Sequence, residues 1–292
     1  MSGQSWMVVA ANDERRLRGT LTKSCDAVVL DLSCCDEMER PAARRLAADW
    51  LGAHRTQVLE SRKMARWVRI GAMGEGRHWR DDLLAVLPAA PDGIVLPRAA
   101  GPDQVRQLAA ELYEIEQKSG LTANSTRLLP VVGETAASAL QVRRFVEDGH
   151  QRIAGLTWNP GALARSLGAK RAASQLGKWS QVFAHVRSEM LLTAHACGIA
   201  AIDALPPACD DAAQIAKLAK LSAEEGFTGM MVARGEHAAL VKKAFSDCRP
   251  DDAESDDKPA AFKRRPALGT FPRRDEPQEQ DSGPPPPVLR PA

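Results

Sequence analysis

The amino-acid sequence predicts a (β/α)8 TIM barrel, a closed ring of parallel strands in which a helix follows each strand. Two observations predict this fold class. Short apolar runs rich in β-branched residues recur along the chain, and a longer amphipathic stretch follows each of them. Eight such units fill roughly 250 residues, which is the usual size of a closed barrel. An open, doubly wound sheet is the alternative, because periodicity alone does not show closure.

The eight predicted strands recur along the first 232 residues. The stretches between them, such as 102–118 and 210–225, carry Ala, Leu, Glu, Lys and Gln at helical spacing. These stretches begin with Asp or Pro, which favour the start of a helix. In chain order, the strands are expected at Trp6–Ala10, Ala27–Leu32, Trp67–Ile70, Gly93–Pro97, Leu128–Val132, Ile153–Trp158, Ile199–Ala204 and Phe227–Val232.

The composition changes after Phe245. Residues 249–292 contain an acidic cluster at 251–257, a basic run at 263–265 and a proline run at 284–287, with few apolar side chains. Such a segment cannot bury a core, so it is predicted to be a disordered tail behind a barrel that spans residues 1–248. The proline run could dock on a partner that binds polyproline helices, or the tail could serve only solubility.

Composition also excludes several functional classes. The net charge of +2, from 39 basic and 37 acidic side chains, gives no general attraction to nucleic acid or to a membrane surface. No stretch approaches a membrane span, and the N-terminus lacks the basic region of a signal peptide, so a cytoplasmic protein is expected. The six cysteines show no zinc-binding spacing, and we expect reduced thiols.

Candidate functional residues follow from the predicted architecture. In this kind of barrel the chemistry takes place at the carboxyl ends of the strands. The second to sixth strands end near Asp31, Arg69, Arg98, Glu134 and Trp158. We therefore expect these five side chains to converge at one mouth of the barrel.

Motifs at these strand ends match, in order and spacing, those of a known enzyme family. From Ser5 to Phe245 the chain resembles the citrate lyase β-subunit/malyl-CoA lyase family, also called the HpcH/HpaI aldolase/citrate lyase family. The matching segments are AVVLDL at 27–32, WVRI at 67–70, DGIVLPR at 92–98, LPVVGETA at 129–136, GLTW at 155–158, GIAAID at 198–203 and GFTG at 226–229. The resemblance implies a CoA ester lyase that acts on an acyl-CoA thioester, uses Mg²⁺ and assembles as a homo-oligomer, a trimer or hexamer.

The resemblance also implies roles for the candidate residues. Such enzymes pass through an enolate, whose oxygen needs a facing metal ion and an arginine. Glu134 would be the metal ligand, Arg69 would hold a substrate carbonyl or carboxylate, and Asp31 would orient Arg69. Arg98 and Trp158 would contact the substrate. The alternatives are that Glu134 is only an acid favoured at a helix N-terminus and that Arg69 only forms an ion pair with Asp31.

The chain departs from the family pattern at three strand ends. Where the family reads GLTWGAEDL, this chain reads GLTWNPGAL, so that Gly161 and Ala162 replace the Glu and the metal-binding Asp. An Asn159 amide oxygen would be a weaker ligand. The other changes are DLSC at 31–34, where the family has DLED, and ARGEH at 233–237, where it has IHPAQ. We therefore expect Mg²⁺ to bind weakly or not at all, and two functions stay open: a lyase of reduced activity, or a catalytically inactive paralogue that binds acyl-CoA or a partner subunit.

Five further residues have open interpretations. Cys34 and Cys35 could supply a nucleophile, or they could be thiols without a role, since no histidine lies near them in sequence. Asp203 could line the mouth or cap the seventh strand–helix turn. Lys170 and Arg171 would suit the phosphates of a CoA thioester if they faced the mouth.

Overall fold

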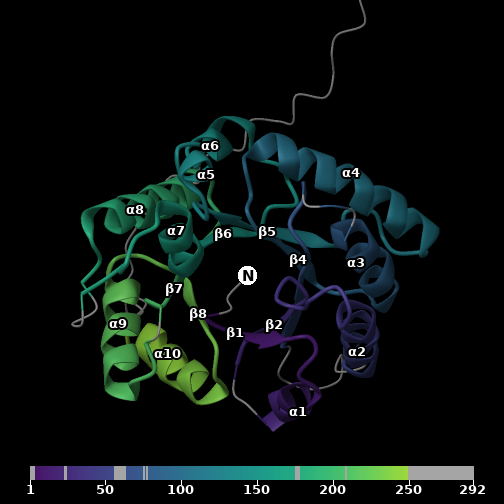
Figure 1. The fold of residues 1–292 in the computed structure, drawn as a ribbon, viewed down its shortest axis with the longest axis horizontal. Helices are drawn as coiled ribbons and strands as arrows, with labels where there is room; N and C mark the ends of the chain where they lie inside the picture. Colours follow the sequence, from purple (N-terminus) through teal and green to yellow (C-terminus); the bar gives the residue numbers. More distant parts are fainter. Residues whose placement is uncertain are drawn as a thin grey trace, which may run out of the picture. The chain divides into compact units, whose positions relative to one another are not determined.

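Eight parallel strands close into a barrel in strict chain order, so the predicted fold class is confirmed and an open sheet is excluded (Figure 1). The computed structural model describes residues 4–22, 25–55, 64–74, 76, 78–174, 178–207 and 209–248. The predicted tail, 249–292, lies outside these residues. The strands are β1 (Ser5–Ala10), β2 (Ala27–Asp31), β3 (Ala65–Arg69), β4 (Gly93–Leu96), β5 (Arg127–Val132), β6 (Gly155–Trp158), β7 (Ala200–Ala204) and β8 (Gly229–Val232).

Helices surround the ring of strands (Figure 1). The helix predicted at 102–118 has those bounds, with its proline at the first turn, where a missing backbone N–H costs nothing. Among the described residues, no helix is both long and apolar enough to cross a membrane. The helices are α1 (Glu14–Arg18), α2 (Arg40–Ala53), α3 (His78–Val86), α4 (Pro102–Lys118), α5 (Ala136–Ala139), α6 (Arg144–Asp148), α7 (Pro160–Leu167), α8 (Gln181–Ala196), α9 (Ala212–Glu224) and α10 (Gly235–Asp247).

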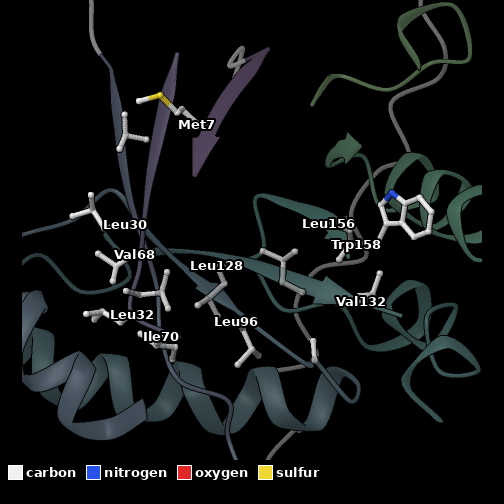
Figure 2. Packing of buried hydrophobic residues seen from close by; sticks show 14 of the residues in the cluster. Met7, Leu30, Leu32, Val68, Ile70, Leu96, Leu128, Val132, Leu156 and Trp158 are labelled. Atoms are coloured by element: carbon white, nitrogen blue, oxygen red, sulfur yellow. The ribbon is translucent and has the colours of Figure 1, made fainter. Parts of the chain in front are cut away.

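Alternation along the strands divides the core into two layers. One buried cluster contains strand residues almost alone, among them Trp6, Val29 and Trp67, and it fills the inside of the barrel. The intervening residues, such as Leu30 and Val68, point outward and pack against the helices (Figure 2). The side a strand residue faces therefore follows from whether its position is odd or even within its strand.

Two indole rings fill much of the barrel interior. The rings of Trp6 and Trp67 lie 5.2 Å apart between centroids and are tilted by 55°. Room for Trp67 depends on the neighbouring strand, because a Cβ added at Gly93 would lie only 2.2 Å from the Trp67 ring. Gly93 thus leaves room for the Trp67 indole to pack without strain.

The strand register already places two candidate residues side by side. Asp31, the last residue of β2, pairs in register with Arg69, the last residue of β3. Both have the same parity as the interior residues of their strands, Val29 and Trp67. Their side chains therefore rise together at the carboxyl-end mouth of the barrel, where the sequence predicted them.

Candidate functional site

Glu134 is the centre of the site, and a tight turn after β5 places it. The strand ends at Val132, and Gly133 follows with φ of 66°. A Cβ at Gly133 would also lie 2.5 Å from Cγ1 of Val186 on α8, so both the backbone conformation and the close approach require glycine. The turn buries the Glu134 side chain, which is 2% exposed.

The buried carboxylate of Glu134 accepts hydrogen bonds from three donors. Nη2 of Arg69 and Nδ2 of Asn159 each donate to Oε1 over 2.9 Å. The backbone N–H of Arg98 donates to Oε2. Residues at the ends of β3, β4 and β6 thus meet on one carboxylate, and this polar satisfaction offsets the cost of burying its charge.

Arg69 also faces Asp31, at longer range. Nη1 of Arg69 lies 3.9 Å from Oδ2 of Asp31, while Oδ1 of Asp31 accepts from the backbone N–H and hydroxyl of Ser33 at 2.8 and 2.6 Å. Among the residues that the structure describes, the buried Nε of Arg69 finds no hydrogen-bond partner. Arg69 therefore forms an ion pair with Asp31, which was one of the two interpretations of its role. Its hydrogen bond, however, is to Glu134. The guanidinium stays 19% exposed at the mouth.

Arg98 joins this group through its backbone. It has φ of 51°, a left-handed conformation that residues other than glycine rarely adopt. That conformation accompanies the hydrogen bond from its N–H to Glu134, and the Arg98 side chain is exposed. A strained backbone held by the surrounding structure is typical of functional sites.

The orientation of Asn159 differs from the expectation that its amide oxygen could bind a metal. Asn159 is the N-cap of α7, and its Oδ1 accepts from the backbone N–H of Ala162 over 3.1 Å. The same amide donates its nitrogen to Glu134. Both partners demand this orientation, because the N–H needs an acceptor and the carboxylate needs a donor. In this orientation the amide oxygen caps α7 and the amide nitrogen faces Glu134.

Trp158 and Asp203 do not reach the mouth. Trp158 belongs to the outer layer with Leu156 (Figure 2), and its Nε1 donates to Oδ1 of Asp203 over 2.8 Å. Oδ2 of Asp203 binds the Arg187 guanidinium of α8 over 2.7 Å. The prediction that Trp158 converges with Arg69 and Glu134 is wrong, because its parity turns it toward the helices. Asp203 likewise braces β7 against α8 instead of lining the mouth.

The vicinal thiols lack the properties of a nucleophile. Burial, together with a smaller contribution from the nearby Asp31 carboxylate, raises the pKa of Cys34 to about 12. Burial also raises the pKa of Cys35. Both thiols contact the backbone carbonyl of Asp31, at 3.3 and 3.8 Å. Catalytic cysteines need a lowered pKa, so a raised pKa leaves neither thiol primed as a nucleophile.

The residues at the mouth do not fit a magnesium site of the kind expected. Mg²⁺ needs carboxylate oxygens that can turn toward it. Both oxygens of Glu134 are held by protein donors, and the amide oxygen of Asn159 caps α7. Gly161 and Ala162 offer no side-chain oxygen. In the part of the chain that the structure describes, no three His, Cys, Asp or Glu side chains gather in a group that could hold a metal.

Sequence reasoning missed two contributions to the site. Ser33 fixes Asp31 through an Asp-x-Ser turn, a local pattern that can be read from sequence. The pattern Asn-Pro at 159–160 likewise signals a helix N-cap followed by proline at the first helical position. That signal would have assigned the amide oxygen of Asn159 to the helix in advance.

Comparison with known proteins points to one enzyme family. Residues 4–235 match the model of the family described as HpcH/HpaI aldolase/citrate lyase. The mitochondrial citramalyl-CoA lyase of Mus musculus is 26% identical over 276 residues, covering 90% of this chain and 77% of the relative. The citrate lyase subunit beta-like protein of Mycobacterium tuberculosis is 27% identical over 246 residues, covering 84% and 79%.

Solved structures resemble the chain to a similar degree. The crystal structure of protein CitE from Mycobacterium tuberculosis in complex with magnesium and acetoacetate has a TM-score of 0.67 and 26% identity, covering 87% of this chain and 93% of that one. A second structure of that protein, in complex with magnesium, acetoacetate and coenzyme A, has a TM-score of 0.63 and 25% identity, covering 86% and 82%.

Proposed function

Because the chain belongs to the HpcH/HpaI aldolase/citrate lyase family, we propose that it is a CoA ester lyase-like protein with reduced activity. It binds a CoA thioester at the mouth of the barrel and cleaves or forms the carbon–carbon bond beside the thioester. The observation that carries this proposal is the convergence of Arg69 on Glu134 and Asp31 at the carboxyl ends of the strands.

The chemistry of such a bond cleavage explains why Arg69 is central. In the cleavage, the hydroxyl group on the departing fragment gives up its proton to water and becomes a carbonyl, while the electron pair of the broken bond passes to the carbon next to the thioester and gives an enolate. The negative oxygen of the enolate needs a positive group already in place. Arg69 is the cation at this position, and its hydrogen bond to buried Glu134 limits the directions in which its guanidinium can point. Asp31, held by Ser33, orients it from the other side.

We propose that Mg²⁺ binds this protein weakly or not at all. In relatives whose structures contain magnesium, the metal would polarise the reacting oxygen as a Lewis acid. Here the one remaining candidate ligand, Glu134, already accepts three hydrogen bonds. With Arg69 as the main source of positive charge, the enolate is stabilised less and turnover falls.

A second candidate is a catalytically inactive paralogue that binds acyl-CoA or a partner subunit. The hydrogen bond from Asn159 to Glu134 favours it, because the amide nitrogen satisfies the carboxylate without a metal. From the family resemblance we further propose a homo-oligomer, a trimer or a hexamer. The near-neutral net charge supports a protein that does not bind nucleic acid or membranes, and we propose that it is cytoplasmic.

The proposal is tested by measuring thioester binding and turnover together. Citramalyl-CoA and malyl-CoA are titrated by calorimetry and then assayed for released thioester product, beside the mouse citramalyl-CoA lyase. We expect measurable binding but turnover roughly 100-fold or more below that enzyme, since losing one pre-organised group for the oxyanion has about this effect. Equal turnover would contradict the reduced-activity proposal. Binding with zero turnover would select the inactive paralogue, and an absence of binding would reject both.

A further inference from the structure

The long connection from β6 to α8 is unusually poor in acids. No Asp or Glu occurs from Gly149 to Ser188. The exposed side chains of this stretch include four cations, Arg165, Lys170, Arg171 and Lys178. The connection starts at the mouth of the barrel, because only Asn159 separates the end of β6 from the start of α7. Positive charge therefore gathers beside the site, with no acid from the same stretch to neutralise it.

Arg165 is the cation of this group that lies nearest in sequence to the end of β6. It lies on α7, one turn after Gly161. A Cβ added at Gly161 would lie 3.7 Å from Nη1 of Arg165 and 3.4 Å from Oδ1 of Asn159. The guanidinium thus reaches back toward the start of its helix, as long side chains on helices do. It lies close to the residue whose amide contacts Glu134.

The local charge at this point is the reverse of the one that the family motif provides. Positions 161 and 162 carry glycine and alanine, where that motif has two carboxylates. Among the residues that the structure describes, none of the ion pairs involves Arg165, whereas Asp210 and Asp211 on the adjacent loop have other partners. A guanidinium without a carboxylate partner is available to bind an anion, and its planar shape suits the two oxygens of a carboxylate.

We propose that Arg165 is a substrate-binding residue that holds a carboxylate of the ligand directly, without a metal ion. The ligand class is a small 2-oxo acid, or the carboxylate carried by the acyl group of a thioester. In this arrangement Arg69 and Arg165 supply the positive charge that a bound metal ion would supply beside the intact family motif. The inference rests on the proposed function, because it assumes that such an acid occupies the same mouth.

The test is a calorimetric titration of the full-length protein with oxaloacetate in the presence of EDTA. We expect the wild-type protein to bind without metal and Arg165→Ala to bind roughly tenfold or more weakly, the size of effect expected for a lost charge-assisted hydrogen bond. Arg165→Lys, which keeps the charge but loses the planar fork, should fall between them. Lys178→Ala is the matched control: it removes one exposed cation from the same connection and should leave the affinity within about twofold of wild type.

Each other outcome overturns the inference. Arg165→Ala that binds oxaloacetate as wild type does, with an unchanged melting temperature, would rule out the residue. Binding by the wild type only after Mg²⁺ is added would rule out a metal-free site, yet the thioester titration could still support the proposed function. If neither oxaloacetate nor any thioester binds, the proposed function fails together with the inference.

Discussion

Replacing Arg69 by alanine should weaken thioester binding by about 100-fold, because the ligand loses its cationic partner at the mouth, and truncating one member of a buried charge pair across a binding interface costs about 2–5 kcal/mol. The change removes the cation that donates to Glu134 and faces Asp31, and it leaves a carboxylate that is 2% exposed with one donor fewer. Calorimetric titration with malyl-CoA measures the loss. Any residual turnover should fall at least as far, since Arg69 is the cation proposed to face the enolate oxygen.

Two variants serve as controls for this prediction. Arg69→Lys retains the charge and should recover part of the affinity. Arg66→Lys changes an arginine at the opposite end of the same strand, where it pairs with Asp92 over 3.3 Å, and should leave binding unchanged. An Arg69→Ala protein that folds and binds the thioester as tightly as wild type would show that ligand does not contact this end of the barrel.

The largest effect on stability is expected from Arg152→Met, with a loss of about 3–5 kcal/mol in the free energy of unfolding. Arg152 and Glu116 are 1% and 0% exposed and form two hydrogen bonds, of 2.7 and 2.8 Å. Nη1 of Arg152 also donates to the carbonyl of Thr126 over 3.0 Å. Removing the guanidinium leaves a buried carboxylate without its cation. Urea denaturation monitored by circular dichroism measures the loss.

The pH dependence of stability gives an independent check on this pair. Burial acts to raise the pKa of Glu116, but hydrogen bonds from Arg152 and from the backbone of Thr126 and Asn124 bring it below its ordinary value. The stability that these bonds contribute is present above the unfolded-state pKa and is lost as pH falls through the lowered folded-state pKa.

Glu116→Leu combined with Arg152→Met should recover much of the stability that Arg152→Met alone loses. A loss below about 1 kcal/mol in the single variant would mean that the pair is not buried as described.

Most of the fold could be predicted from the sequence because its signals are local and repeated. Each strand is a short apolar run, and the residues at its carboxyl end follow by position alone. Asp31 and Arg69 were therefore placed correctly, since strand ends in a barrel share one mouth. The prediction for Trp158 failed for a related reason. A residue at the end of a strand lies at the height of the mouth along the barrel axis, but its odd or even position in the strand decides whether it faces the interior or the helices.

The parts of the site that escaped prediction depend on competition between partners. The amide of Asn159 carries a donor and an acceptor, and only the neighbouring N–H of Ala162 and the carboxylate of Glu134 decide which end faces the mouth. The position of Arg165 beside Gly161 depends on how its long side chain folds back along α7. Such contacts join groups whose relative placement follows from the folded chain, so residue types and spacing do not determine them.

Titration of the protein with MgCl2 in a calorimeter measures whether this mouth binds Mg²⁺. We expect no saturable binding tighter than about 1 mM for the wild-type protein, which is a binding free energy near −4 kcal/mol. The double variant Gly161→Glu, Ala162→Asp restores two acids at the start of α7 and should bind more tightly, because a Cβ at position 161 meets only ordinary contacts. Micromolar binding of Mg²⁺ by the unmodified protein would mean that a working metal site remains, and Glu134 would then have to exchange its three protein donors for the ion.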